Sequence, residues 1–291
     1  MKKKFLSIVT ALVLVLTMFA SCGGSNDAEG FDVNKEITVV TREEGSGTRD
    51  AFVELTGVLV KDGDTKTDNT TTSAVTINST EAVITNVKDN NYAIGYISLG
   101  SMNDSVKAVK INDVEATAEN VKSGNYKISR PFNIAYKNGL SDIAMDFVDY
   151  ILSSDGQKIV EENGYVAVSD AEAYAGSKPS GKVVVAGSSS VSPVMGKLAE
   201  AYKKVNPNAD IEIQTLDSSA GMQSAINGTC EIGMASRALK DEEKATLTET
   251  TIAKDGIAVI VNKENTCDSL TMEQVKAIYT SEATVWSDII K

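Results

Sequence analysis

The stretch at residues 37–55 most constrains how this chain can fold, because a strand-like run, a glycine loop and a helix-like run follow one another without a break. Residues 37–40 are all β-branched and predict a strand, whereas residues 50–55 have the pattern of a helix. The loop between them reads REEGSGTR at residues 42–49. We therefore expect one strand–loop–helix unit of an α/β protein here.

The backbone and hydroxyl groups of this loop suit a small oxyanion. The first N–H groups of a helix have no partner within the helix and carry partial positive charge. Gly45 and Gly47 let the backbone approach an anion closely, and Ser46 and Thr48 add hydroxyl donors. The alternative is an ordinary helix start with Thr48 as the capping residue, and the motif alone does not decide between the two.

Arginine is scarce in the chain, and its positions favour the anion interpretation. The four arginines are Arg42, Arg49, Arg130 and Arg237, so two of them flank the loop. Lysine supplies the other positive charges, which means that arginine does not serve as general surface charge. A planar guanidinium binds an oxyanion through two parallel hydrogen bonds. The alternative for Arg49 is a solvent-exposed side chain.

The rest of the chain alternates between strand-like and helix-like runs, which predicts an α/β architecture with mostly parallel sheets. Residues 61–80 are polar and are expected to form an exposed excursion, and residues 169–181 a connector. The expected strands are 92–97, 106–111, 130–136, 182–186, 211–215 and 256–261, and the expected helices are 81–88, 140–153, 157–162, 194–205, 222–227 and 272–279.

Three further loops share the chemistry of the first. They read GSSSVSP at 187–193, DSSAG at 217–221 and ASR at 235–237, and each follows a strand-like run. A single serine loop could simply cap a helix, as Ser190 or Ser192 could do. Ligands of α/β proteins collect at the carboxyl ends of strands. Four such loops in one chain therefore indicate an anion-binding site.

The composition excludes several functions. The chain has no histidine, which removes Ser-His-Asp catalysis and histidine metal sites, and it shows no spaced carboxylate cluster for a metal. Its net charge of −12 argues against a nucleic-acid partner. Walker-type and dinucleotide-binding fingerprints are absent. We expect a protein that is not an enzyme, with no catalytic residues, no metal and no cofactor.

The N-terminus has the pattern of a bacterial lipoprotein signal. Three lysines precede an apolar run, and Ala20 and Ser21 lead to Cys22. The resemblance to a lipobox implies a signal peptide at 1–21, a lipid on Cys22 and a flexible tether at 22–34. The protein would then be held outside the cytoplasm at the cell membrane. A plain cleaved signal and an uncleaved anchor are the alternatives.

Two more cysteines, Cys230 and Cys267, lie far from the N-terminus. An exported protein can form a disulfide, but spacing alone does not show whether these two meet. They are equally compatible with two small buried side chains. Both interpretations stay open at this point.

Together these motifs resemble the phosphate-binding proteins of bacterial phosphate ABC importers (PstS-type). The resemblance covers nearly all of residues 36–291 and includes DGIA at 255–258 beside the four loops. It implies a type II periplasmic-binding-protein-like α/β fold with two lobes, mixed or parallel sheets and a cleft between the lobes. It also implies capture of inorganic phosphate, delivery to the ABC permease and a monomeric protein.

The order of the motifs departs from the usual family pattern. In most members the segment similar to residues 187–193 comes first, and the one similar to 42–49 follows the stretch that contains Trp286. The sequence resembles a circular permutation in which the connector 169–181 joins the old ends. A fragment of a longer tandem is the competing explanation, but one complete set of motifs behind one signal favours permutation.

The resemblance also predicts how the lobes divide. The first lobe would contain residues 35–129 and 262–291, and the second would contain residues 130–261. The hinges would lie at residues 130–133 and 259–263.

The expected phosphate ligands come from both lobes and are hydroxyl, N–H or guanidinium donors. They are Arg42, Ser46, Gly47, Thr48, Ser189, Ser190, Ser218 and Ser236, with Arg49 and Arg237 as additional ligands or as partners in ion pairs at the rim of the cleft.

Two further positions follow from the resemblance. Glu44 stands where the family often has an acid that pairs with the site arginine. Ser236 stands where several members have a buried aspartate that accepts a proton from phosphate, which leaves the discrimination against sulfate less secure. A binding lipoprotein for another oxyanion, a surface adhesin and an enzyme acting on phosphate esters are the alternative functions.

Overall fold

The computed structural model describes residues 30–63, 65–168 and 170–290. The chain divides into a unit over Met1–Asp32 and a unit over Val33–Lys291, and the second unit carries the fold described below. The predicted signal peptide, Cys22 and residues 22–29 of the predicted tether lie outside the described residues. None of the described helices has both the length and the apolar character that crossing a bilayer requires.

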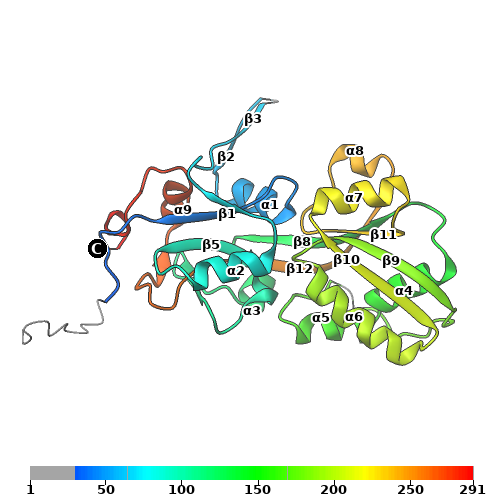
Figure 1. Ribbon diagram of the computed structural model, residues 1–291. Helices are drawn as coiled ribbons and strands as arrows, with labels where there is room; N and C mark the ends of the chain where they lie inside the picture. Colours follow the sequence, from blue (N-terminus) through cyan, green and yellow to red (C-terminus); the bar gives the residue numbers. More distant parts are fainter. Residues whose placement is uncertain (1–29, 64, 169, 291) are drawn as a thin grey trace, which may run out of the picture. The chain divides into compact units, whose positions relative to one another are not determined.

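A nine-stranded mixed sheet is the framework of the Val33–Lys291 unit (Figure 1). Its strand order is β10-β9-β11-β8-β12-β5-β1-β4, and β6 pairs with β12. The strands are β1 Thr38–Arg42, β4 Val75–Ile77, β5 Ala93–Ser98, β6 Lys107–Ala108, β8 Ser129–Tyr136, β9 Gly181–Ser188, β10 Ala209–Leu216, β11 Ile232–Ala235 and β12 Thr248–Val261. Two smaller sheets pair β2 (Leu59–Asp62) with β3 (Thr65–Asp68) and β7 (Lys110–Ile111) with β13 (Ser269–Leu270).

The expected α/β fold with mixed or parallel sheets is confirmed, and the sheet is parallel only toward its two ends. β10, β9 and β11 are parallel to one another, as are β5, β1 and β4. Between them, β8 and β12 are antiparallel to each other and to their outer neighbours β11 and β5. The expectation of mostly parallel sheets was therefore wrong for β8 and β12 at the centre of the main sheet.

Most helices coincide with the apolar periodicity of the sequence. They are α1 Gly47–Leu55, α2 Thr80–Lys88, α3 Ala118–Lys122, α4 Asp142–Leu152, α5 Ser154–Glu162, α6 Ser192–Val205, α7 Ser218–Asn227, α8 Asp241–Lys244 and α9 Met272–Tyr279, with 3₁₀ turns at Leu99–Ser101 and Trp286–Asp288. In α4, for example, Ile143, Phe147 and Ile151 are buried on one face. Serine, threonine or aspartate side chains cap most of these helices.

Helices cover both faces of the strands β9 and β11 (Figure 1). Val183 and Val185 of β9 belong to a hydrophobic core with α4, α5 and α6, whereas Ala186 belongs to a separate core that contains Met222 of α7. Successive side chains of a strand point to opposite faces, which explains this division. The carboxyl end of β9 is thus held from two sides.

A third core holds the strand β1 and the helix α2. Val40 packs with Val83 and Val87 of α2, and the rings of Phe52 and Tyr96 stack at 3.9 Å between centroids. The core thus holds β1 against α2, and the separate stack of Phe52 on Tyr96 holds α1 against β5. The strands β8 and β12 run from this group of elements to the group around β9 (Figure 1).

Several elements differ from the sequence-based expectation. Helix α7 begins at Ser218 rather than at residue 222, and the strand expected at 106–111 is divided between β6 and β7. Residues 61–80 are not a simple excursion, because they include β3 and also β4, which joins the main sheet beside β1. β12 begins at Thr248 rather than near residue 256, since its polar first half pairs with β8. Helix α1 begins at Gly47 and is capped by Ser46, so the alternative in which Thr48 is the capping residue was wrong.

The two ends of the Val33–Lys291 unit pair with each other. The N–H of Ser287 donates to the carbonyl of Val33 at 2.6 Å, and the N–H of Trp286 donates to the carbonyl of Lys35 at 3.2 Å. Glu36 and Val285 also form an antiparallel bridge. The first and last segments of this unit are therefore neighbours.

Candidate functional site

The first loop of the site connects β1 to α1. Arg42 is the last residue of β1, and Ser46 caps α1 by accepting a hydrogen bond from the N–H of Arg49 at 3.4 Å. Gly45 has φ +88°, a conformation that favours glycine. Arg42, Ser46 and Thr48 are each at most 2% exposed. The loop therefore buries one guanidinium and two hydroxyl groups at a helix N-terminus.

The second loop follows β9 and leads into α6. Ser189 is 7% exposed and Ser190 is fully buried. Gly187 is required just before them, because a Cβ atom at this position would lie 2.3 Å from the carbonyl oxygen of Met234 in β11. Close packing of β9 against β11 thus sets the position of the two serines.

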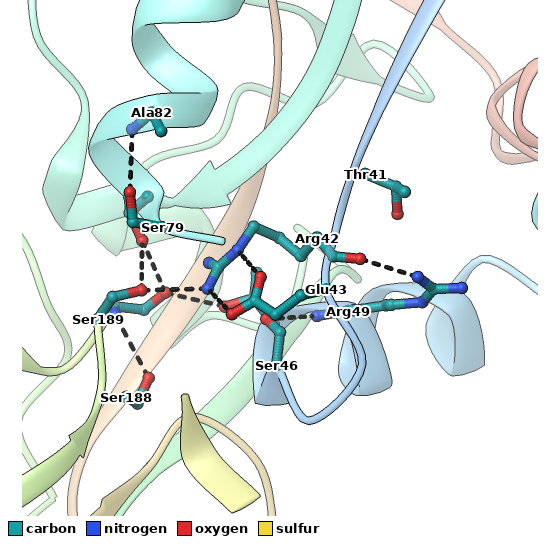
Figure 2. Close-up of polar contacts among 12 residues, drawn as sticks. Thr41, Arg42, Glu43, Ser46, Arg49, Ser79, Ala82, Ser188 and Ser189 are labelled. Carbon is teal, nitrogen blue, oxygen red and sulfur yellow. Dashed lines mark hydrogen bonds and ion pairs between the residues drawn. The ribbon is translucent and has the colours of Figure 1, made fainter. Parts of the chain in front are cut away.

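Direct contacts join these two loops across the fold. The Nη2 of Arg42 donates to the Oγ of Ser189 at 3.1 Å, as Figure 2 shows. The hydroxyl groups of Thr48 and Ser190 lie 2.8 Å apart, and either could be the donor. The sequence prediction that residues near the start and past the middle of the chain meet is consistent with these contacts.

The remaining two loops complete a cluster of hydroxyl groups. The N–H of Ser236, just after β11, donates to the Oγ of Ser218 at 3.1 Å, and Ser218 is the first residue of α7. The Oγ of Ser236 lies 3.5 Å from the hydroxyl of Thr48. Both serines are fully buried. The N-termini of α1 and α7 and the segment that leads into α6 therefore meet at this hydroxyl cluster.

Gly47 faces this cluster through its α-carbon. A Cβ atom at Gly47 would lie 2.5 Å from the Oγ of Ser218 and 2.9 Å from the Oγ of Ser236. Any side chain larger than hydrogen would displace one of these hydroxyls. The glycine is thus a requirement of the site and not only of the turn.

Glu43, rather than Glu44, holds the site arginine. The carboxylate of Glu43 accepts from Nε and Nη2 of Arg42, both at 2.8 Å (Figure 2). Glu44 lies in the turn with an exposed side chain, so its expected pairing with Arg42 was wrong. The reason is local geometry, because Glu43 still follows the strand direction whereas the chain has turned away at Glu44. The pair fixes the guanidinium with one donor toward Ser189.

Arg49 lies beside the cluster and binds a carboxylate. It pairs with Asp68 of β3 at 2.9 Å and donates to the carbonyl oxygen of Arg42 at 2.8 Å. The ion-pair alternative describes this contact, and a ligand role for Arg49 stays a prediction.

Arg237 makes a larger set of ion pairs. Its guanidinium contacts Glu243 through two bonds of 2.8 Å, Asp50 of α1 at 3.1 Å and the hydroxyl of Ser219 at 3.2 Å. Burial acts to raise the pKa of Glu243, but the hydrogen bonds from Arg237 and from the N–H of Lys240 lower it overall. A ligand role for Arg237 likewise stays a prediction.

Sequence reasoning missed a buried ion pair behind the cluster. Arg130 of β8 contacts Asp255 of β12 at 3.0 Å and donates through Nη1 to the carbonyl oxygen of Ser236 at 3.0 Å. Burial raises the pKa of Asp255 to about 6, although Arg130 and the hydroxyl of Ser98 oppose the shift. The scarcity of arginine in the sequence was the available signal, because Arg130 is one of only four.

Thr80 is a second residue that the sequence analysis did not select. It is the first residue of α2, is 3% exposed, and lies within hydrogen-bond distance of both Ser189 and Ser190. The dipeptide Ser79-Thr80 before a helix-like run was a weak signal, since it equally describes an ordinary helix cap.

Other site types find little support in the part of the chain that the structure describes. Cys230 and Cys267 are free and buried, so the disulfide alternative was wrong. Among residues 30–63, 65–168 and 170–290, no group of three or more cysteine, aspartate or glutamate side chains is arranged to hold a metal ion.

Comparison with known proteins gives consistent matches over the whole length. The profile described as the PBP superfamily domain matches residues 26–155 and 172–290. Phosphate-binding protein PstS 2 of Streptococcus agalactiae serotype V is 50% identical over 100% of this chain and 99% of its own length. Phosphate-binding protein PstS 2 of Streptococcus pneumoniae serotype 4 is 44% identical over 98% of this chain and 99% of its own.

A solved structure agrees with these matches. The phosphate-binding protein of a phosphate ABC transporter from Streptococcus pneumoniae TIGR4 superposes with a TM-score of 0.70 at 46% identity. The superposition covers 88% of this chain and 100% of the other.

Proposed function

We propose, from the premise that this chain belongs to the PBP superfamily and within it to the PstS phosphate-binding proteins, that it captures inorganic phosphate for an ABC importer. In this function the protein binds phosphate outside the cytoplasm and releases it to the permease without chemical change. Two relatives that match this chain over nearly their full length are named phosphate-binding protein PstS 2. The proposal needs a site that surrounds a tetrahedral anion, and the hydroxyl cluster supplies one.

One observation supports the proposal most directly: several uncharged hydrogen-bond donors lie close together around one buried guanidinium, that of Arg42. The guanidinium of Arg42 donates to the hydroxyl of Ser189, and the hydroxyl of Thr48 lies within hydrogen-bond distance of those of Ser190 and Ser236. Neutral hydroxyl and N–H donors can disperse the charge of an anion through hydrogen bonds, which are roughly twice as strong when one partner is charged. Because the cluster is buried, water competes little for these donors.

The net charge of the protein does not oppose this function. Donors in a buried site act at about 3 Å, whereas surface carboxylates are screened over a Debye length of about 8 Å at physiological salt. The acidic surface therefore has little effect on an anion already inside the site.

We also propose that the ligand is enclosed between two lobes. The first would comprise residues 35–129 and 262–291, and the second residues 130–261. This division assigns Arg42, Ser46, Gly47 and Thr48 to the first lobe and the other four site serines, Ser189, Ser190, Ser218 and Ser236, to the second. The pairing of β12 with β5 joins the two parts, and the hinges would lie at residues 130–133 and 259–263. Closure of such lobes on a ligand is a known form of domain motion.

Anchoring through a lipid on Cys22 is a separate part of the proposal, and it rests on the sequence alone. Growth of the producing cells with an alkyne-tagged fatty acid should label the full chain and leave a Cys22→Ala variant unlabelled. Equal labelling of both chains would refute the proposed lipid on Cys22, and it would leave the proposal of phosphate binding unaffected.

Calorimetry on the purified chain from Val33 onward tests the central claim. Phosphate, sulfate, molybdate and a chromogenic phosphate ester are titrated in turn. Tight binding of phosphate with no turnover of the ester is the expected result. Turnover of the ester, or no binding of phosphate, would refute the proposal.

One observation favours a broader oxyanion specificity as a second candidate. Among the described residues, no carboxylate contacts the hydroxyls of Thr48, Ser190, Ser218 or Ser236. A buried carboxylate would reject an anion that carries no proton, such as sulfate, because the two negative charges would be left facing each other. Comparable affinities for phosphate and sulfate in the same titration would favour this candidate.

A further inference from the structure

Thr80 reaches the hydroxyl cluster from α2, a helix that supplies none of the phosphate ligands expected from the sequence. It is the first residue of α2, and the side chain of Ser79 caps this helix by accepting from the N–H of Ala82 at 3.3 Å (Figure 2). The helix is held in place by its buried apolar face, which includes Val83 and Val87. Thr80 therefore has a fixed backbone and a buried side chain, 3% exposed.

The hydroxyl of Thr80 lies beside both serines of the loop that follows β9. Its Oγ1 lies 3.2 Å from the Oγ of Ser190 and 3.4 Å from the Oγ of Ser189. Ser189 in turn accepts from Arg42, and Ser190 contacts Thr48. Thr80 is thus placed as centrally among the expected ligands as Thr48 is.

The backbone of the same helix adds donors beside this hydroxyl. Ser79 satisfies the N–H of Ala82 through its side chain and the N–H of Val83 through its carbonyl. Within the described residues, the N–H groups of Thr80 and Glu81 have no such acceptor. Free N–H groups at a helix start carry partial positive charge and favour an anion.

We propose that Thr80 is a further ligand residue, whose hydroxyl donates a hydrogen bond to one oxygen of the bound oxyanion. This inference rests on the proposed function, and it adds α2 to the helix N-termini that surround the anion. In this arrangement one oxygen of the bound phosphate depends on the hydroxyl of Thr80.

The variant Thr80→Val tests the proposal, because valine keeps the shape of threonine and removes only the hydroxyl. We expect phosphate affinity to fall about tenfold, the loss typical of one hydrogen bond to a charged group. Thr80→Ser keeps the hydroxyl and should restore affinity to within about threefold of the original protein. The matched control is Thr85→Val on the same helix, whose hydroxyl only donates to the carbonyl of Glu81 at 3.0 Å on the exposed side.

Phosphite separates a ligand contact from an indirect structural effect, since it carries a P–H bond in place of one oxygen. In Thr80→Val the P–H bond can face the valine methyl groups, so phosphite should lose less than about threefold while phosphate loses about tenfold. The affinity ratio of phosphate to phosphite should therefore shrink in this variant. A structural role would weaken both ligands equally and leave the ratio unchanged.

Each outcome of the titrations decides one claim. Affinity of Thr80→Val within twofold of the original protein, or an unchanged ratio of phosphate to phosphite, overturns the role of Thr80 alone. Failure of the unaltered protein to bind phosphate overturns the proposed function, and the inference with it. Thermal unfolding of all three variants checks that each one folds.

Discussion

Arg42 and Ser189 are 147 positions apart in the sequence, and the guanidinium of the first donates to the hydroxyl of the second at 3.1 Å. This bond joins the end of β1 to the end of β9, and these strands are each next to an edge strand on opposite sides of the same sheet. Glu43 orients the guanidinium through two further bonds of 2.8 Å. The charge that Arg42 brings to the cluster is therefore held in a fixed direction by Glu43.

Replacing Arg42 should weaken phosphate binding more than any other single change in the loop. In Arg42→Met the anion loses its charged hydrogen-bond partner, and we expect affinity to fall by more than about tenfold in calorimetry. Arg49→Met is the comparison, because Arg49 belongs to the same loop but pairs with Asp68 of β3. Equal losses in the two variants would show that Arg42 is not the principal charged ligand.

Gly47→Ala should block the site sterically. The added methyl would lie 2.5 Å from the Oγ of Ser218 and 2.9 Å from the Oγ of Ser236, so one of these hydroxyls has to move. We expect phosphate affinity to fall by more than tenfold and the free energy of unfolding to fall by about 1–3 kcal/mol, as in other overpacked sites. Calorimetry and urea unfolding measure the two effects.

Gly196→Ala serves as the control for this substitution. Gly196 lies within α6, and a Cβ atom there would have no neighbour within 4 Å. Alanine favours the helix, so the free energy of unfolding should rise by about 0.5–1 kcal/mol with unchanged phosphate affinity. If Gly47→Ala binds phosphate as tightly as the original protein, the added methyl group does not disturb the binding site. The phosphate site would then lie elsewhere.

The loops were predictable from the sequence because their signal is local. Ser189 and Ser218 follow strand-like runs and precede helix-like runs, and parallel strands bring such loops to one edge. Thr80 carries the same local signal as any helix cap. Only the packing of α2 against Val40 brings it to Ser189 and Ser190, and no local pattern encodes that contact.

Tertiary pairing also explains the errors in the fold. The first half of β12, from Thr248, is polar and gives no strand signal by itself, but it pairs with β8, with one shift of register between Thr251 and Ala253. The polarity persists because several of these side chains face solvent. Glu43 and Glu44 are adjacent and chemically identical, so the choice between them depends on where the turn begins.

Asp255 makes stability depend on pH in a direction opposite to that of most carboxylates. Its pKa is raised to about 6 by burial, above the ordinary value of 3.8, so the folded chain holds a proton that the unfolded chain has released between these values. The contribution of Asp255 to the free energy of unfolding is therefore largest below pH 4. It should fall by on the order of 3 kcal/mol as the pH rises from about 4 to about 6.

The variant Asp255→Asn isolates this effect, since asparagine mimics the protonated acid. Urea unfolding of both proteins is measured between pH 4 and 7.5, and the variant is compared with the original at each pH. The difference in stability should shift in favour of the variant as the pH rises. A shift in favour of the original protein would show instead that Arg130 lowers the pKa of Asp255 below its ordinary value.

The adjacent ends of the Val33–Lys291 unit predict that the chain tolerates a change of order. Ser287 and Val33 are hydrogen-bonded at 2.6 Å, so a short flexible linker can join the two ends without strain. New ends are placed at Lys178, within the segment 170–180, which forms no helix or strand. The flanking contacts of Ser177 with Asp146 and of Pro179 with Asn206 can persist on either side.

The reordered chain should fold and bind phosphate with an affinity within about threefold of the original, because the site loops keep their sheet positions. Calorimetry measures binding, and thermal unfolding measures the expected modest loss of stability. A second chain opened at Val259, in the buried part of β12 that pairs with β5, should fail to fold. If the chain opened at Lys178 fails equally, the order of elements matters for folding, and the hypothesis that this sequence is a circular permutation of the usual family order loses its physical basis.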